Sequence, residues 1–364
     1  MKTIAFYLPQ FHPIKENNKW WGGGFTEWHN VSRAKPLFKG HRQPQIPDEL
    51  GFYDLRCTET RHQQIALAKE YGIDAFCYYH YWFNGKQLLE TPLNKMLADK
   101  DSDLPFCLCW ANETWSRAWD GNDREILMQQ TYSDEDNVEH AKHLCKIFAD
   151  ERYLKIEGKP IFIIYRVGRM QDPKKFVDVL ESEAVAQGLP GVRVFAVRNF
   201  SCDVSDEELA KAGIHDIVDF QPNNTEFPKR SLVGKGYRFL QRLWNSAAKK
   251  LGMSEVYSVL RLNYKGVAQN VLKLYEKFGD NHYPTVFPNW DNSPRRKGAT
   301  IIQNDNPEDF ANWVHRTAEI VRKRPPQKQF LFVNAWNEWA ESAHLEPERE
   351  KGRAFLEAFK KGIR

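Results

Sequence analysis

The strongest constraint on the fold is an alternation along the chain between short apolar runs and longer stretches of helical periodicity. The apolar runs are rich in β-branched and aromatic residues, and they are too continuous to belong to strands that expose one face to water. We therefore predict buried strands at 3–8, 74–82, 104–111, 160–165, 192–197, 215–220, 283–287 and 330–336.

A predicted helix follows each of these strands. Ser205 and Asn306 provide N-caps, and Gly72 and Gly188 lie just past two predicted helix ends. Strand–helix units repeated in this way predict a (β/α)8 TIM barrel, an α/β fold with parallel strands. A doubly wound open sheet is the alternative, but LPQFHP follows the first strand in place of a glycine-rich phosphate loop. The helices are expected at 56–72, 91–100, 133–150, 172–188, 205–213, 265–279, 306–323 and 351–362.

The chain of 364 residues is long enough for one large domain or two ordinary ones. No linker, repeat or low-complexity tract divides it, so we predict a single barrel domain over 1–364. The connection between the sixth and seventh strands exceeds an ordinary loop and is predicted to be an insertion at 222–282. Its basic amphipathic stretch, with Tyr237, Leu240 and Trp244 near helical spacing, either packs on the barrel or forms a lid, a partner surface or an attachment to an anionic membrane.

The loops after the predicted strands carry most of the tryptophan, histidine and acidic residues. Examples are NETWSRAWDGND after the third strand, PNWDNSPRRKG after the seventh and NEWAESAHLEP after the eighth. In a barrel these loops gather at the carboxyl ends of the strands, where active sites lie. The chain has 12 Trp, which is more indole than a core requires. Sugar rings, with apolar C–H faces beside hydroxyls, are one ligand class that fits such a surface.

Two glutamates after the eighth strand are the candidate catalytic pair. If the segment after Trp336 turns helically, Glu338 and Glu341 lie at i and i+3, with Cβ atoms roughly 5–6 Å apart. Retaining glycosidases typically hold two carboxyls about 5–5.5 Å apart. A structural interpretation is also open, because acids in the first turn of a helix interact favourably with its dipole. A proton-donating acid needs an apolar or negatively charged setting, which Trp336, Trp339 and Glu338 offer to Glu341.

Several long motifs resemble those of a known family. AFYLPQFHP, GGGFTEW, CWANETWSRAWDG and PNWDNSPR are similar to segments of the WbsX-like proteins, which occur in bacterial polysaccharide biosynthesis clusters, and together they cover nearly the whole chain. NEWAESAHLEP resembles the NEWxEGTQIEP signature of family 99 glycoside hydrolases, the endo-α-1,2-mannosidases and mannanases, which are (β/α)8 barrels. The chain departs from that signature at 342–345, where the hydrolases have GTQI.

The resemblance implies a retaining glycoside hydrolase or transglycosylase that acts on a bacterial polysaccharide or oligosaccharide. In family 99 the first signature glutamate is the base toward the substrate's 2-hydroxyl, which attacks C1 to form a 1,2-anhydro sugar, and the second is the acid/base for the leaving group. Position by position, Glu338 takes the first role and Glu341 the second. The expected substrate-binding residues are Tyr7, His12, Glu27, Trp28, His80, Tyr81, Trp110, Asn112, Glu113, Trp115, Trp290, Asp291, Trp336 and Asn337.

Alternatives remain beside this interpretation. Glu27 and Glu113 also follow predicted strands and border tryptophans, so either is a candidate acid if the pair is structural. The protein is alternatively a non-hydrolytic biosynthesis component, namely a glycosyltransferase or a glycan-binding barrel. Nucleotide-sugar transferases commonly carry an Asp-x-Asp metal motif, but DSD at 101–103 lies at a helix end, away from the predicted mouth. Arg295 and Arg296 are interpreted either as contacts to an anionic sugar or a diphosphate carrier, or as solvated surface.

Charge and residue spacing argue against several other ligands. The net charge is +4, from 52 basic and 48 acidic residues that are scattered along the chain, so no nucleic-acid partner is expected. The histidines match no metal-ligand spacing, and the cysteines are interpreted as small core residues, so we predict neither a metal nor a cofactor. No segment resembles a membrane span of roughly 18 apolar residues or a secretory signal, which predicts a cytoplasmic protein. The oligomeric state is left open.

Overall fold

A barrel of parallel strands forms the centre of the computed structural model, which describes residues 1–364 except 118–121, 200–203, 224–226, 228–242, 246–258 and 297. The barrel strands are β1 (Lys2–Tyr7), β2 (Ala75–Phe83), β4 (Phe106–Trp110), β8 (Lys159–Ile164), β9 (Arg193–Arg198), β10 (Asp216–Asp219), β12 (His282–Val286) and β15 (Phe330–Val333). They pair in the order β1-β15-β12-β10-β9-β8-β4-β2, and β2 closes the ring by pairing with β1. The predicted (β/α)8 barrel is therefore confirmed.

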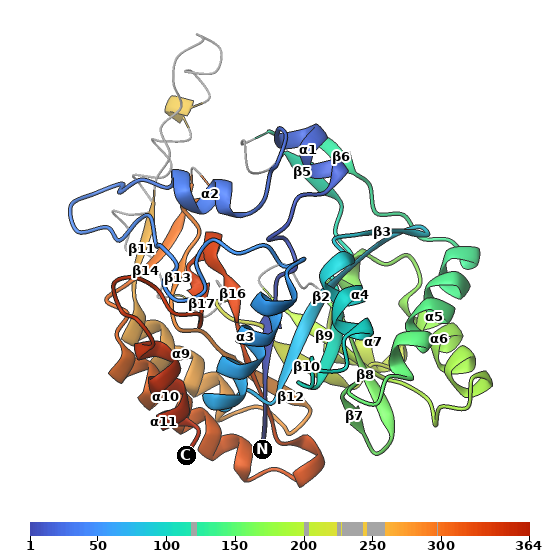
Figure 1. Cartoon of the computed structure of the whole chain (residues 1–364). Coiled ribbons are helices and arrows are strands. Elements are labelled where there is room, and N and C mark those ends of the chain that lie inside the picture. The colour runs from blue at the N-terminus through green and yellow to red at the C-terminus, as the bar shows by residue number, and fades with distance from the viewer. Residues whose placement is uncertain (118–121, 200–203, 224–226, 228–242, 246–258, 297) are drawn as a thin grey trace.

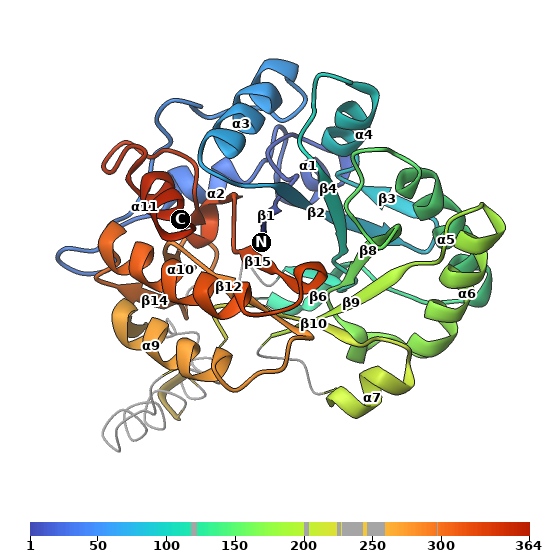
Figure 2. The same ribbon diagram turned by 90° about the horizontal axis from the view of Figure 1, so that it is seen from below.

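A ring of helices covers the outside of the barrel, as Figure 2 shows with the N-terminus near its centre. These helices are α3 (Thr58–Glu70), α4 (Thr91–Ala98), α5 (Asp134–Phe148), α6 (Pro173–Ala186), α7 (Asp206–Lys211), α9 (Tyr264–Tyr275), α10 (Pro307–Arg322) and α11 (Ala354–Gly362). Both predicted N-caps are present: Ser205 Oγ accepts a hydrogen bond from Glu208 N, and Asn306 Oδ1 accepts one from Asp309 N. The caps satisfy backbone N–H groups that the first helical turn leaves unpaired.

The eighth strand ends earlier than the apolar run that predicted it. β15 stops at Val333, and beyond it the backbone bonds to both neighbouring strands in turn. Asn334 N donates to Val286 O (2.9 Å), and Trp336 N donates to Phe6 O (2.8 Å). The segment that carries the two glutamates therefore begins at the mouth of the barrel.

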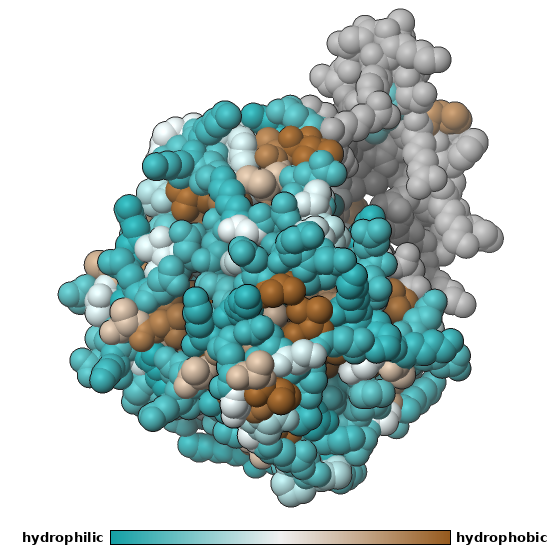
Figure 3. Space-filling view, turned by 90° about the vertical axis from the view of Figure 1, so that its right-hand side faces the viewer, coloured by the Kyte–Doolittle hydropathy of each residue, from teal (hydrophilic) through white to brown (hydrophobic). Residues whose placement is uncertain are grey.

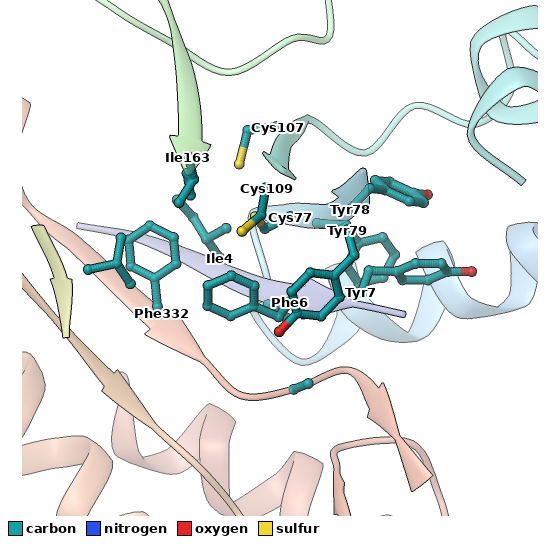
Figure 4. Packing of buried hydrophobic residues seen from close by; sticks show 14 of the residues in the cluster. Ile4, Phe6, Tyr7, Cys77, Tyr78, Tyr79, Cys107, Cys109, Ile163 and Phe332 are labelled. Atoms are coloured by element: carbon teal, nitrogen blue, oxygen red, sulfur yellow. The ribbon is translucent and has the colours of Figure 1, made fainter. Parts of the chain in front are cut away.

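Side chains fill the barrel interior, as expected for a strand number that leaves no pore. Figure 4 shows part of this packing, where the rings of Phe6 and Phe332 lie with centroids 5.7 Å apart. Each fully buried phenylalanine contributes roughly 1.5–3 kcal/mol to stability. The buried free thiols agree with the predicted role of cysteine in the core: Cys77, Cys107, Cys109 and Cys145. Cys57 is exposed instead, because it lies at the surface just before α3, and Cys202 lies outside the described residues.

The remaining elements are mostly short and gather toward the carboxyl ends of the strands, in the upper half of Figure 1 and away from the N-terminus. The mouth elements are α1 (Lys15–Trp21), α2 (Trp28–Arg33), β3 (Lys86–Leu88), β5 (Trp115–Arg117), β6 (Asn122–Met128), η2 (Val167–Arg169), β11 (Leu260–Asn263), β13 (Trp290–Asp291), β14 (Thr300–Gln303), β16 (Asn337–Glu338), η5 (Trp339–Glu341) and β17 (Ala343–His344). The chain also contains β7 (Lys155–Ile156), which pairs with β8, and η4 (Pro326–Lys328), which precedes β15.

The predicted insertion at 222–282 falls partly outside the described residues. Its described part supplies β11 and the barrel helix α9. Tyr237 and Leu240 lie outside the described residues, whereas Trp244 is about half exposed. A single domain over 1–364 with this insertion stays a prediction.

The surface is largely hydrophilic on the face drawn in Figure 3, where the apolar patches are small and separate. Among the helices that the structure describes, none combines the length and the apolar character needed to cross a bilayer.

Candidate active site

A cavity of about 470 Å³ lies at the carboxyl ends of the barrel strands. This volume falls within the ~300–1,000 Å³ typical of small-molecule sites. The residues predicted from the sequence that line it are Tyr81, Glu113, Trp115, Trp290, Glu338 and Glu341. Further lining residues include Gln10, Trp21, Tyr79, Tyr165, Arg166, Asn199, Phe220, Arg295 and Arg296. The wall therefore combines aromatic side chains with hydrogen-bonding groups.

A short hairpin holds the two glutamates. β16 and β17 are antiparallel, with Glu338 opposite Ala343, and the 3₁₀ turn η5 connects them. Ser342 follows the turn in the left-handed conformation, with φ 56°. Glu341 is the last residue of η5, so the predicted helical spacing takes the form of one tight 3₁₀ turn rather than the first turn of an α-helix.

One guanidinium connects the pair. Arg295, from the loop between β13 and β14, places Nη2 3.0 Å from Glu338 Oε2 and Nη1 3.0 Å from Glu341 Oε1. Nη2 also lies 3.1 Å from Glu27 Oε2. The Arg295 side chain is only 10% exposed, so the solvated-surface interpretation of this residue is wrong. Arg296, its neighbour, is exposed.

The environment of Glu338 favours its protonated form. Burial raises the pKa of Glu338 to about 8; Arg295 acts in the opposite direction, whereas the charges of Glu341 and Glu27 reinforce the effect of burial. Burial has the largest influence on this pKa, so the protonated form of Glu338 is more favoured here than in water.

A buried polar cluster fixes the hairpin from behind. Glu346 accepts hydrogen bonds from Tyr53 OH (2.7 Å), Gln64 Nε2 (2.6 Å) and Trp339 Nε1 (2.6 Å). Burial raises the pKa of Glu346 to about 7, although these donors favour the carboxylate. Trp339 also stacks on His344, with ring centroids 3.6 Å apart. The indole between the two glutamates in sequence is therefore held both by its N–H and by its ring face.

A second charged group lines another part of the cavity. Arg166 donates from Nε to Glu113 Oε1 (2.7 Å) and from Nη1 to Asn199 Oδ1 (2.7 Å). Asn112 fixes the backbone of Arg166, since Arg166 N donates to Asn112 Oδ1 (2.8 Å) and Asn112 Nδ2 donates to Arg166 O (3.0 Å). The Glu113 side chain is 41% exposed, so this ion pair faces solvent in the cavity.

The other predicted binding residues lie behind the described cavity wall. Four of them are aromatic core residues, namely Tyr7, Trp28, Trp110 and Trp336. The polar atoms of the first three donate to protein acceptors at 2.7, 2.8 and 3.2 Å. Trp28 and Trp110 are therefore not among the residues that line the cavity. Trp110 ends β4, and side chains along a strand alternate between two faces, so a residue near a strand end can point away from the site.

Asn337 and Asp291 support the mouth loops from beneath. Leu8 N donates to Asn337 Oδ1 (2.7 Å), which ties the hairpin to the end of β1. Asp291 accepts hydrogen bonds from His41 Nε2 and Gln43 Nε2, both at 2.7 Å. Asp291 therefore braces the 41–43 loop and does not line the described wall, contrary to expectation; Asn112, bonded to Arg166, departs from the same expectation.

The predicted histidines and Glu27 are also buried. Burial lowers the pKa of His12 to about 4 and that of His80 to about 3. His80 Nε2 lies 3.0 Å from His140 Nε2. Glu27 is fully buried and contacts Arg295 rather than the cavity. Among the residues that the structure describes, no three His, Cys, Asp or Glu side chains are grouped so that they could hold a metal ion.

Comparison with known proteins identifies the family. Residues 3–359 match the family described as Glycosyltransferase WbsX. The chain belongs to this family. Two curated relatives, each named uncharacterized protein WxcX and each from a strain of Xanthomonas campestris pv. campestris, are 38% and 37% identical over 362 and 366 residues. These matches cover 99% of this chain and 49% of each relative, so the chain spans about half the length of those relatives.

Solved structures share the fold of this WbsX-family chain. A family 99 endo-α-mannosidase from Bacteroides thetaiotaomicron, in complex with bis-tris-propane, matches with a TM-score of 0.60 and 11% identity, over 100% of this chain and 96% of that chain. A glycoside hydrolase-like protein matches with a TM-score of 0.61 and 11% identity, over 100% and 94%. At this identity the likeness establishes a common barrel fold and leaves activity to the site itself.

Sequence reasoning did not predict Arg166 as a site residue, and it left two interpretations open for Arg295. Arg166 lies two residues past the end of β8, a position from which barrels present site residues, but no tryptophan or acid adjoins it in the sequence. Arg295 lies in a loop that was expected at the mouth, yet its bond to Glu27 joins residues 268 positions apart. No spacing rule detects a contact of that range.

Proposed function

We propose that this WbsX-family barrel is a glycosidase-type enzyme that cleaves or transfers glycosidic bonds of a bacterial polysaccharide or oligosaccharide. Glu338 and Glu341 are the proposed reacting carboxyls. The observation that carries the proposal is their shared position: both line one cavity at the barrel mouth, and both lie 3.0 Å from the same guanidinium. Trp115 and Trp290, in the same wall, offer ring faces that suit the C–H faces of sugars.

The proposed reaction follows the roles that the resemblance implies. Glu338 accepts the proton of the substrate's 2-hydroxyl while O2 attacks C1, the bond from C1 to the leaving oxygen breaks, and Glu341 gives its proton to that oxygen. The product of this step is a 1,2-anhydro sugar. Glu341 then takes a proton from water or an acceptor hydroxyl, whose oxygen attacks C1; the C1–O2 bond opens, and O2 regains the proton from Glu338. Two displacements at C1 retain its configuration.

The pKa of Glu338 bears on which carboxyl has which role. A base must be ionised, whereas burial raises the pKa of Glu338 to about 8. If Glu338 is the base, kcat/KM rises with pH through this value. If Glu338 is instead the proton donor and Glu341 attacks C1 directly, kcat/KM falls over the same interval. A 2-deoxy substrate separates the two routes as well, because it closes the anhydro-sugar route and leaves direct attack open.

Glycosyl transfer is the second candidate, and the description of the family as a glycosyltransferase favours it. In the proposed reaction, transfer differs from hydrolysis only in the nucleophile that opens the intermediate. A sugar hydroxyl that occupies the cavity beside Glu113 and Arg166 would compete with water for C1. Product analysis with and without an added acceptor sugar therefore distinguishes transfer from hydrolysis.

The test of the proposed function is a panel of defined oligosaccharides, including mannose- and rhamnose-containing glycans, with products analysed by NMR. We expect cleavage or transfer with retained anomeric configuration, and loss of both in Glu338→Gln. If Glu338→Gln and Glu341→Gln keep wild-type rates on a substrate that the wild-type protein turns over, the pair is structural. Soaking crystals with monosaccharides and with nucleotides adds an independent check, since a nucleotide ordered in the cavity would instead indicate a nucleotide-sugar transferase.

A further inference from the structure

We propose that Arg295 is a positioning residue that fixes the separation and the charge of the Glu338–Glu341 pair, with Glu27 as its permanent counter-ion; this rests on the proposed catalytic role of the pair. Arg295 does not react in this scheme. It acts through the two carboxyls that it contacts.

The geometry of the guanidinium supports a positioning role. Nη1 lies 3.0 Å from Glu341 Oε1, and Nη2 lies 3.0 Å from Glu338 Oε2, so the two prongs of one planar fork hold the two carboxylates. A planar guanidinium has its donors in fixed directions, which a flexible ammonium lacks. The separation between the two carboxyl oxygens that face Arg295 is therefore set by the spacing of its two terminal nitrogens.

Glu27 anchors Arg295 from the side away from the cavity. Arg295 Nε and Nη2 both lie 3.1 Å from Glu27 Oε2. Glu27 is fully buried just before α2, and its backbone N donates to Gln10 O (3.3 Å). A substrate in the cavity does not reach a fully buried carboxylate. Glu27 can therefore keep its bond to Arg295 while Glu338 and Glu341 act on the sugar.

The charges in this cluster are unequal, because one guanidinium faces three carboxyls. Among the described residues, Tyr79 and Tyr81 from β2 interact with Glu338 and Tyr165 interacts with Glu341, while Glu113, Arg166 and Arg296 line the same cavity. Burial raises the pKa of each tyrosine above its ordinary value, so they stay neutral. The excess negative charge favours a proton on the pair, and Arg295 limits how firmly that proton is held.

The charges of Arg295 and Glu27 therefore shift the pKa of Glu338 in opposite directions. Loss of the Arg295 charge removes an attraction that favours the Glu338 carboxylate, so its pKa rises. Loss of the Glu27 charge removes a repulsion, so the pKa of Glu338 falls. Two residues that only supported the loop, without their charges acting on Glu338, would not give shifts of opposite sign.

The test is a ¹³C NMR titration of the glutamate carboxyls in the full chain without substrate, with the Glu338 resonance identified by its absence in Glu338→Gln. We expect Arg295→Gln to raise the pKa of Glu338 by about 1–3 pH units and Glu27→Gln to lower it by about 1 pH unit. The matched control is Arg316→Gln, which removes an exposed guanidinium on α10, outside the cavity lining, and should leave this titration nearly unchanged. Shifts of the same sign, or equal shifts in the control, overturn the proposed role of Arg295.

Further measurements keep the result interpretable if Arg295→Gln does not fold. Arg295→Lys keeps the charge but not the fork, so we expect it to preserve the pKa of Glu338 more nearly than Arg295→Gln while lowering kcat. Glu27→Gln alone still tests the sign of the shift. Because the titration needs no substrate, opposite shifts in a protein without glycosidic activity would refute the proposed function and support the charge-setting role of Arg295. Activity with no shifts would do the reverse.

Discussion

The cavity has two arginine–glutamate groups that differ in burial. Around Arg295, side-chain exposure is 10% for the arginine, 0% for Glu27, 8% for Glu338 and 22% for Glu341. Arg166 is similarly buried, at 13%, but its partner Glu113 is 41% exposed. The two groups therefore differ mainly in how far the carboxylates are open to solvent.

The difference in burial determines what each group can do. Charges removed from water interact strongly, and they control where a proton resides. The Glu113 carboxylate of the other group is open to solvent, so water partly screens its bond to Arg166 and that bond can exchange for a bond to a ligand. We therefore expect the Arg295 group to govern the chemistry and the Arg166 group to govern sugar binding.

Glu338→Gln tests the buried group most severely. Whether Glu338 is a base or a proton donor, an amide cannot replace it, so we expect kcat to fall by about 10²–10⁴-fold or more with every substrate. The measurement is steady-state kinetics on a substrate found with the oligosaccharide panel, with circular dichroism as the control for folding. Wild-type kcat in a folded Glu338→Gln variant would contradict the division between the two groups.

Glu341→Gln should have an effect that depends on the leaving group. As the proposed leaving-group acid, Glu341 matters most when the departing oxygen is strongly basic, because a good leaving group departs without protonation. We expect a large loss of kcat with natural glycosides and appreciable turnover of an activated aryl glycoside. Equal losses on both substrates would show that Glu341 is not the acid for this step.

Arg166→Lys tests the exposed group. The substitution keeps the charge but disturbs the bonds to Glu113 and Asn199, so we expect KM to rise by about tenfold with little change in kcat, as expected for loss of a charge-assisted hydrogen bond. Glu113→Gln should behave in the same way. A fall in kcat comparable to that of Glu338→Gln would instead make Glu113 a participant in the chemistry, as its position next to Trp115 also allows.

The pH dependence of stability should show the smallest effect. Burial raises the pKa of Glu338 to about 8 and that of Glu346 to about 7, above the ~4.3 of an unfolded glutamate. The folded protein then binds protons that the unfolded chain releases, so this contribution is fully present below about pH 4 and is lost as pH rises through 7 and 8. We expect the Tm of Glu338→Gln to decline less between pH 5 and pH 8.5 than that of the wild type. Glu319→Gln, at an exposed carboxyl, is the control and should follow the wild type.

The structure confirms the barrel elements that were expected from the sequence. The boundaries of β1, β2 and β9 lie within a few residues of the predicted strands, because continuous apolar runs bounded by polar loops report burial on both faces. The same rule gave the wrong end for β15, since Trp336 is apolar and buried but lies beyond the strand. Apolarity reports burial and not backbone conformation.

The candidate site was predictable only in part. Trp115, Trp290 and the glutamate pair were expected at the mouth and do line the cavity. Trp28 was expected beside them on the same grounds, yet its indole packs away from the cavity, with Nε1 bonded to Tyr53 O. Composition places a residue in a loop, but the direction of its side chain depends on how that loop folds over its neighbours.

The periodicities that build a barrel are present in the sequence, and they predict the end of the barrel at which Glu338 and Glu341 emerge. Which charges meet there depends on how the whole chain folds. Arg295 lies 43 positions from Glu338 and 268 from Glu27, and burial brings all three into one cluster. Periodicity is local and can be seen in a single chain. The pairing of charges depends on the folded structure. A buried guanidinium or carboxylate is costly without an opposite charge beside it, and that partner can come from any position in the sequence.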